Sequence, residues 1–335
     1  MSPCPQNISA LRVRGQAHPP DPAKVKTAMA ATLLAAAAGL AALLLFPKRA
    51  GDPTRSSARR PIASNSEACT AAARKLNGGA SVLAFAVLTD SGLEHYRGLY
   101  FNRFMYVPLV ASTMTLGVSL HGIRDEGNSL RQLRDAVYRL AGLIGLAGTG
   151  FHLYNLHKRP GRYAFQNLFY GAPIGAPFAL LLAGLLGVAG ERVREASEKP
   201  ELAGIPEGRA LAGVTAAGLL GTVGEVALFH FRGAYHDPFM FLPVTVPPLA
   251  AVGVAAAALD GRLTPRPFTR WMLRATAALG VAGVGFHVYG ISRDMGGWRN
   301  WSQNLLNGPP LPAPPSFAGL ALAGLAALRL LDVAR

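Results

Sequence analysis

Residues 95–108 read HYRGLYFNRFMYVP and residues 230–243 read HFRGAYHDPFMFLP, so one pattern occurs twice at an offset of 135 (230 minus 95). At the same offset GTGFHLY (148–154) matches GVGFHVY (283–289). QNLFYGAP (166–173) matches QNLLNGPP (303–310) at an offset of 137 (303 minus 166). Self-similarity at a fixed spacing indicates a duplicated structural unit. We therefore predict an internal repeat, whose second copy has two extra residues in one loop.

Apolar runs near 20 residues separate these matched stretches, and a helix of about that length crosses a bilayer. Half of the 335 residues are apolar and only 15% are charged, against about 25% in soluble domains. This composition excludes a disordered chain and argues against one soluble domain. Open strands are excluded because lipid leaves their backbone groups unpaired. We predict an all-α polytopic membrane protein with about nine transmembrane helices, eight of them in a tandem duplication of a four-helix unit in parallel orientation.

The predicted organisation has six parts. Residues 1–26 form a disordered N-terminal tail, 27–47 a single transmembrane helix, 48–78 a basic linker, 79–195 repeat 1, 196–209 a second linker and 210–335 repeat 2. The apolar run at 29–47 is long for a signal peptide and no cleavage site follows it directly, so a retained span is favoured. The spans within the repeats are predicted at 79–98, 104–121, 136–156, 173–191, 210–231, 239–259, 268–290 and 317–332.

The formal net charge of +15 comes from Lys and Arg placed mostly between apolar runs. That placement is typical of topology signals rather than of nucleic-acid binding, which we exclude. The basic excess of the 48–78 linker and of one set of loops predicts that these lie in the cytoplasm. The opposite, histidine-bearing face then points outward from the cell inner (plasma) membrane. The two cysteines, Cys4 and Cys69, belong to no CxxC or Cys/His cluster, which excludes a disulfide framework and thiolate-ligated clusters.

Four histidines occupy matched positions near predicted helix ends, all on one side of the membrane: His95, His152, His230 and His287. Neutral imidazole is a common ligand of haem iron and of other metals. The first and third helices of an up-down unit are diagonal, so the pairs His95/His152 and His230/His287 are each placed to hold a haem b edge-on. Glycines near these pairs would leave room for a flat macrocycle: Gly148, Gly150, Gly283 and Gly285. The alternatives are ligation of another metal, and plain hydrogen bonding to loops or lipid headgroups.

Polar residues at matched positions surround these histidines. Asp90 and Glu225 lie inside apolar helices, where carboxylates usually face a cavity or a partner. We predict that they pair with Arg97 and Arg232, line a proton path or form a structural ion pair. A ligating imidazole also needs a partner for its second nitrogen. The candidates are backbone carbonyls and four loop residues: Gln166, Asn167, Gln303 and Asn304. The unmatched histidines are predicted to be structural or solvated: His18, His121, His157 and His236.

No nucleophile elbow, P-loop, dinucleotide fingerprint or H-E-x-x-H motif occurs, so no autonomous catalytic motif supports an enzyme. The four-helix unit with paired helical histidines resembles the general plan of di-haem b-type cytochrome membrane subunits. That resemblance implies an electron-transfer or anchor subunit serving an extracytoplasmic oxidoreductase, with the lipid bilayer and an extracytoplasmic redox protein as partners. Both pairs here share one side, which differs from proteins that stack haems across the bilayer. The alternatives are a transporter or channel with its pathway between the repeats, and a structural membrane subunit without cofactor.

Overall fold

The computed structural model describes residues 65–333 apart from 126–128, 196–200, 203–204 and 260–265. The predicted tail, the predicted helix at 27–47 and the start of the basic linker lie outside the described residues. Within the described part the protein is helical, except for an antiparallel pair of two-residue strands, β1 (Glu201–Leu202) and β2 (Ile205–Pro206). The prediction of an all-α fold is therefore confirmed for this part of the chain.

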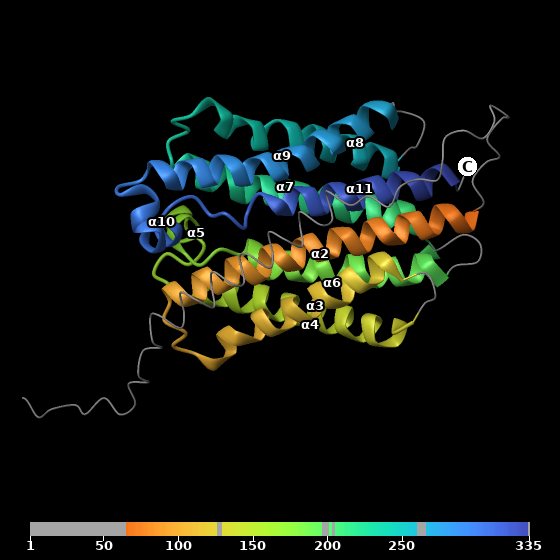
Figure 1. The fold of residues 1–335 in the computed structure, drawn as a ribbon, viewed down its shortest axis with the longest axis horizontal. Coiled ribbons are helices and arrows are strands. Elements are labelled where there is room, and N and C mark those ends of the chain that lie inside the picture. Colours follow the sequence, from red (N-terminus) through yellow and green to blue (C-terminus); the bar gives the residue numbers. More distant parts are fainter. Residues whose placement is uncertain (1–64, 126–128, 196–200, 203–204, 260–265, 334–335) are drawn as a thin grey trace, which may run out of the picture.

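Eight long helices run along one common direction (Figure 1). They are α2 (Asn65–Arg97), α3 (Val107–Arg124), α4 (Arg131–His157), α6 (Gly175–Glu195), α7 (Glu207–Arg232), α8 (Val246–Leu259), α9 (Arg266–Arg293) and α11 (Pro315–Val333). Shorter elements connect them: η1 (Arg103–Tyr106), α5 (Phe165–Tyr170), η2 (Pro238–Val244), η3 (Gly297–Asn300) and α10 (Trp301–Asn307). Both α5 and α10 lie at the same end of the molecule (Figure 1).

Six segments of the described chain are long and apolar enough to cross a membrane: 103–124, 175–195, 207–232, 238–259, 266–293 and 315–333. They support the prediction of a membrane protein, while the number of nine spans stays a prediction. Two helices with predicted spans, α2 and α4, are not among the six. Both carry polar residues, such as Asn77 and Asp90 in α2 and Arg134 in α4. Polar groups are tolerated in a membrane where a helix faces protein, and α2 packs against α3, α6 and α11.

Helix α2 begins at Asn65, inside the region predicted as a linker up to residue 78. The basic pair Arg74 and Lys75 suggested a loop, but residues 68–73 are alanine-rich and alanine has the highest helix propensity. Glu67 in the first turn complements the helix dipole. The first helix is therefore a single element of 33 residues that reaches well beyond the predicted span.

Each half of the described chain is a four-helix arrangement. In the first half α2 and α4 each pack on both α3 and α6, so α2 and α4 are diagonal. In the second half α7 and α9 each pack on both α8 and α11, so α7 and α9 are diagonal. The halves meet where α2 packs on α11 and where α6 packs on α7. The order of long helices is thus alike in both halves, although descent from one duplicated unit stays an inference from the sequence.

Glycines lie where helix backbones approach most closely. A Cβ added at Gly184 would lie 2.5 Å from the backbone nitrogen of Gly142, and one at Gly79 would lie 2.7 Å from the carbonyl oxygen of Gly319. The first contact joins α6 to α4, and the second joins α2 to α11 across the two halves. Small residues of this kind allow close helix packing in membranes. The close approach of these helices follows from them.

Candidate functional site

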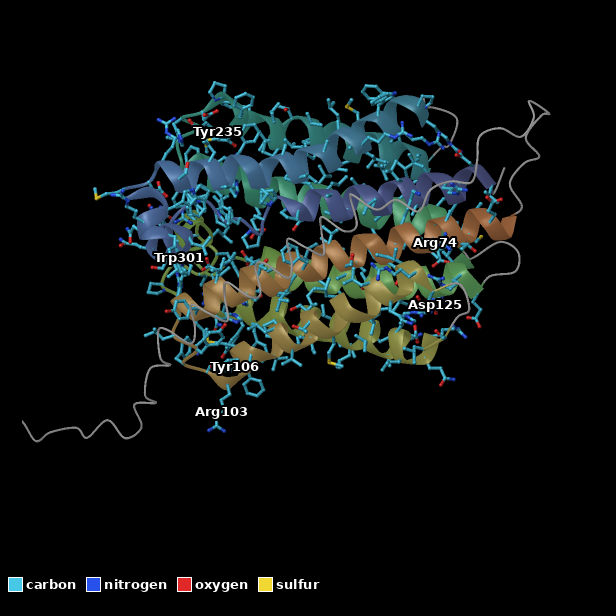
Figure 2. The ribbon with its side chains drawn as sticks, viewed as in Figure 1. Arg74, Arg103, Tyr106, Asp125, Tyr235 and Trp301 are labelled. Carbon is cyan, nitrogen blue, oxygen red and sulfur yellow. The ribbon has the colours of Figure 1, made fainter. Side chains whose placement is uncertain are left out.

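The four matched histidines lie in the last turns of their helices or close to them: His95 in α2, His152 in α4, His230 in α7 and His287 in α9. The end of the molecule that carries Tyr106, Tyr235 and Trp301 in Figure 2 is termed the histidine end. The opposite end, which carries Arg74 and Asp125 in the same view, is termed the arginine end. The rings of His95 and His230 contact Tyr100 and Tyr235 edge-on, with centroids 6.2 and 5.9 Å apart.

Every one of these imidazoles has its Nδ1 atom hydrogen-bonded to a backbone carbonyl. The partners are Met105 for His95 (2.6 Å), Pro173 for His152 (2.7 Å), Met240 for His230 (2.7 Å) and Pro310 for His287 (2.7 Å). A carbonyl oxygen can only accept, so Nδ1 carries the proton in each ring. In the neutral imidazole Nε2 then keeps its lone pair, which is the form that binds a metal. The hydrogen-bond partners of the four imidazoles are therefore backbone carbonyls and not the Gln and Asn side chains.

The methionine carbonyls are positioned by the same turn in both halves. Two consecutive residues with positive φ reverse the chain in each turn: Leu99 and Tyr100, then Ala234 and Tyr235. The tyrosine hydroxyl then donates to a carbonyl of the preceding long helix, at 3.1 Å for Tyr100 and 3.3 Å for Tyr235. Leu99 and Tyr100 precede Ala234 and Tyr235 by 135 residues, which is the offset of the sequence repeat. The repeated motif therefore encodes a turn that presents a carbonyl to a histidine.

The histidines of each half are close enough to interact electrostatically. His152 is affected by His95, and His287 by His230. All four side chains belong to half-buried residues. Helices α2 and α4 are diagonal, as are α7 and α9, so each half carries its two histidines on diagonal helices.

The nearby glycines have two different roles. A Cβ added at Gly150 or Gly285, two residues before His152 and His287, meets nothing within 4 Å. Both glycines are exposed, so this space lies on the outer surface of the bundle. At Gly148 and Gly283 a Cβ would lie 3.1 and 2.8 Å from the Cβ atoms of prolines in α6 and before α11, Pro177 and Pro314. Gly148 and Gly283 therefore serve helix packing, and the room for a macrocycle that was predicted from these four glycines finds no support.

No group of three or more His, Cys, Asp or Glu side chains that could hold a metal ion occurs among the described residues. A metal centre with added carboxylates therefore finds no support in this part of the chain. Cys69 is a free, buried cysteine. Each half carries two imidazoles whose Nε2 atoms keep their lone pairs.

The matched acids Asp90 and Glu225 differ in their contacts. Glu225 Oε1 accepts a hydrogen bond from the backbone N–H of Gly175 at 3.0 Å, across the boundary between the halves. The position matched to Gly175 is Pro312 (175 plus 137), which has no N–H to donate. Accordingly, Asp90 makes no hydrogen bond within the described residues, although it interacts electrostatically with Glu225 and Glu94.

The other predicted partners bind elsewhere. Arg97 forms an ion pair with Glu94 at 2.7 Å, and Arg232 lies over the rings of Phe169, Tyr170 and Phe229, 5.5–5.8 Å from their centroids. The predicted ion pairs of these arginines with the two buried acids do not form. Asn167 donates to the carbonyls of Pro160 and Arg162, and Asn304 to those of Met295 and Gly297. Gln303 accepts from Asn300 at 3.2 Å and Gln166 is exposed. These amides brace the loops instead of touching the histidines.

A buried charged network at the arginine end was not predicted from the sequence. Arg134 is fully buried and forms ion pairs with Asp125 (2.5 Å) and Glu191 (2.7 Å). Its guanidinium also lies 3.1 Å from Nδ1 of His121. Asn77 donates to Glu191 at 3.4 Å and accepts from the hydroxyl of Tyr138. His121, predicted to be structural or solvated, therefore belongs to a network that joins all four long helices of the first half.

A sequence signal for this network exists in the differences between the two copies. Asn77, Arg134 and Glu191 are matched by Ala212, Thr269 and Leu328, at offsets of 135, 135 and 137. A search for residues that both copies share, which found the histidines, passes over such positions.

A comparison with known protein families, curated proteins and solved structures finds no match. The fold thus defines the chain as a helical membrane protein that carries four matched histidines at one end.

Proposed function

We propose that this membrane protein binds one haem b in each half and carries electrons for an extracytoplasmic oxidoreductase. His95 and His152 would hold the first haem, and His230 and His287 the second. One observation carries the proposal: all four Nδ1 atoms bond to carbonyls at matched positions, which leaves four Nε2 lone pairs free. Plain hydrogen bonding to loops also accounts for these four bonds, so the spectrum of the purified protein decides between the two interpretations.

The residues present fit such a group in two respects. Two neutral imidazoles on diagonal helices can ligate one iron from opposite sides, as b-type haem requires. The carbonyl bonded to each Nδ1–H fixes the ring orientation and raises the basicity of Nε2. When bound, haem iron accepts and donates one electron, while the chain holds the rings and limits contact with water.

The location of the site suggests its partner. The basic residues favour a cytoplasmic arginine end, which would place both histidine pairs at the outer surface of the inner membrane. Two haems at one surface suit exchange with a redox protein outside the cell membrane better than transfer across the bilayer. The proposed role is therefore that of a membrane anchor and electron carrier for such a partner.

The transporter alternative, with a pathway between the halves, has weaker support. The backbones of Gly79 and Gly319 are in close contact between α2 and α11, which leaves no room for a pathway at that level. Glu225, proposed to line the pathway, has an oxygen bonded to the backbone of Gly175. The third alternative, a structural subunit without cofactor, predicts a colourless protein.

Spectra of purified histidine variants test the proposal. The wild type should show a Soret band that shifts on reduction with dithionite. His95→Ala and His230→Ala should each retain about half of the haem, because each removes an axial ligand from one of two sites. His236→Ala is the matched control: it lies at the same end, is exposed and bonds only to the carbonyl of Gly233. A wild type without haem, or a full haem content in both ligand variants, contradicts the proposal.

A further inference from the structure

A line of buried polar side chains runs through the first half of the molecule. Its members are at most 5% exposed: Asn77, Ser81, Thr89 and Ser91 on α2, Ser112, Thr115 and Ser119 on α3, and Tyr138 on α4. Polar groups inside a membrane bundle are costly and commonly mark pathways for ions or protons. The position of these residues along the helices shows whether they form one path.

The packing of α2 against α3 gives the order of the polar residues along the bundle. Asn77 lies against Gly122, and Val87 shares a small buried cluster with Ala111. The residue number rises along α2 while that of its partner on α3 falls, so the two helices are antiparallel. Two residues at the same height in the bundle, one on each helix, therefore have numbers that add to about 199 (77 plus 122 gives 199, and 87 plus 111 gives 198). Ser119 then lies level with Ser81, Thr115 and Ser112 continue toward Thr89, and Ser91 follows.

Successive polar levels are two to four residues apart, which is about 3–6 Å at 1.5 Å per residue. A single water molecule bridges polar atoms at that separation. The hydroxyls of Ser112, Thr115 and Ser119 donate to the carbonyls four residues earlier at 2.6–2.7 Å. Their own lone pairs remain available to accept a hydrogen bond from water. Ser119 also lies within hydrogen-bonding range of Tyr138, which donates to Asn77.

Titratable groups stand at both ends of this line. At the arginine end, Glu191 and Asp125 are held by Arg134, and Asn77 links Glu191 to Tyr138. At the histidine end, Asp90 follows Thr89 directly and is surrounded electrostatically by Glu94, Glu225 and Arg97. A carboxylate at each end of a hydroxyl-lined interior is the arrangement expected of a proton pathway.

The second half serves as an internal comparison because it has the same helix packing without these polar groups. The matched residues are Ala212, Ala216, Gly224, Val226, Pro247, Ala250, Val254 and Leu273. The packing is alike: Gly187 of α6 lies against Tyr138, and the matched Gly324 of α11 lies against Leu273. The fold therefore does not require buried polar residues at these positions. Most of these side chains are hydrogen-bonded within the protein, so the fold tolerates them, and a function specific to the first half explains why only that half carries polar groups at these positions.

We infer that the first half conducts protons through its interior, between the Asp125–Arg134–Glu191 cluster and Asp90, and that the second half does not. Each carrier along the line passes one proton forward and receives one from behind, so the net event is transfer of one proton without any other chemical change. Water molecules bonded to the hydroxyls are the carriers between them. The inference stands on the polar line alone and does not depend on haem.

Proton flux into liposomes tests this inference. The purified protein is reconstituted into vesicles that contain pyranine, potassium and valinomycin, and the internal pH is followed after an external acid step. We expect faster acidification than in vesicles without protein. Ser119→Val and Tyr138→Leu, which introduce the residues of the second half, should lower the protein-dependent rate at least tenfold. Thr276→Ala is the matched control, because Thr276 is a buried hydroxyl of the second half whose counterpart is Ala141.

Two outcomes overturn the inference: a wild-type rate equal to that of empty vesicles, or full flux in both first-half variants. Tyr138→Phe keeps the ring and removes only the hydroxyl, so it separates loss of the path from loss of folding. Its gel-filtration profile and melting temperature should stay near the wild type while its flux falls. A colourless protein that conducts protons would refute the haem proposal alone, and a haem protein without flux would refute this inference alone.

Discussion

Glu225 and Asp90 illustrate how one backbone atom changes the role of a residue. Both are carboxylates at matched positions, but Glu225 accepts from the N–H of Gly175, whereas the position matched to Gly175 is Pro312, whose amide nitrogen carries no hydrogen. Glu225 thereby fastens α6 of the first half to α7 of the second. Gly175 suits this contact because an added Cβ would lie 1.7 Å from Glu225 Oε2. The carboxylate of Asp90 has no such hydrogen bond, so its oxygens are available to take up a proton.

Replacing the two acids should therefore have unequal effects on stability. Glu225→Leu removes a charge-assisted hydrogen bond and should lower the free energy of unfolding by about 1.5–3 kcal/mol. Glu225→Gln keeps an acceptor oxygen and should lose less. Asp90→Leu, the matched control, should lose little or gain stability. Melting temperatures in detergent measure the difference, and equal losses for Glu225→Leu and Asp90→Leu would contradict the assignment.

At the scale of elements, the two halves stabilise the arginine end by different means. In the first half Arg134 of α4 bonds to Glu191 of α6 and to Asp125 after α3, and Asn77 of α2 completes the set. In the second half the same levels are filled by apolar or small residues, among them Leu273 and Leu328, both fully buried. Buried ion pairs seldom stabilise more than a well-packed apolar set, but breaking one is costly.

Arg134→Thr should therefore be strongly destabilising on its own. It leaves Asp125 and Glu191 buried without their counterion, at a cost of about 3–5 kcal/mol. Adding Asn77→Ala, Tyr138→Leu and Glu191→Leu introduces the residues matched to these positions in the second half and should recover part of that loss, because Glu191 no longer lacks a counterion while Asp125 still does. Thermal unfolding in detergent compares the single and quadruple variants. A quadruple variant less stable than the single one would show that the first half depends on its polar network.

At the scale of the whole molecule, the halves interlock at the histidine end. The short helix α5 of the first half packs on α7 of the second, with Phe165 and Phe169 against Phe231 at centroid distances of 6.4 and 6.0 Å. Conversely, α10 of the second half packs on α2 of the first, where Leu93 and Leu305 share a buried cluster. These contacts join the two halves at the histidine end, where both short helices lie (Figure 1).

The orientation of the protein in the membrane can be tested directly. In a background without the natural cysteines, Arg159→Cys reports the histidine end and Arg124→Cys the arginine end; both native side chains are exposed. A membrane-impermeant maleimide added to intact cells should label residue 159 only, because the basic excess predicts a cytoplasmic arginine end. Labelling of residue 124 alone would reverse the predicted topology, and labelling of both or neither would contradict a helix bundle that crosses the membrane.

The sequence by itself determined the helical membrane class, the approximate helix positions and the four matched histidines, because apolar run length and self-similarity are local properties of the chain. It also gave backbone carbonyls as candidate partners of the imidazoles. Only the tertiary structure decided which carbonyls these are, and that Glu225 bonds to Gly175 across the halves. The buried network of Arg134 likewise depends on four helices meeting at one level. Such contacts join residues far apart in the chain, and no local pattern of charge or hydropathy encodes which of them meet.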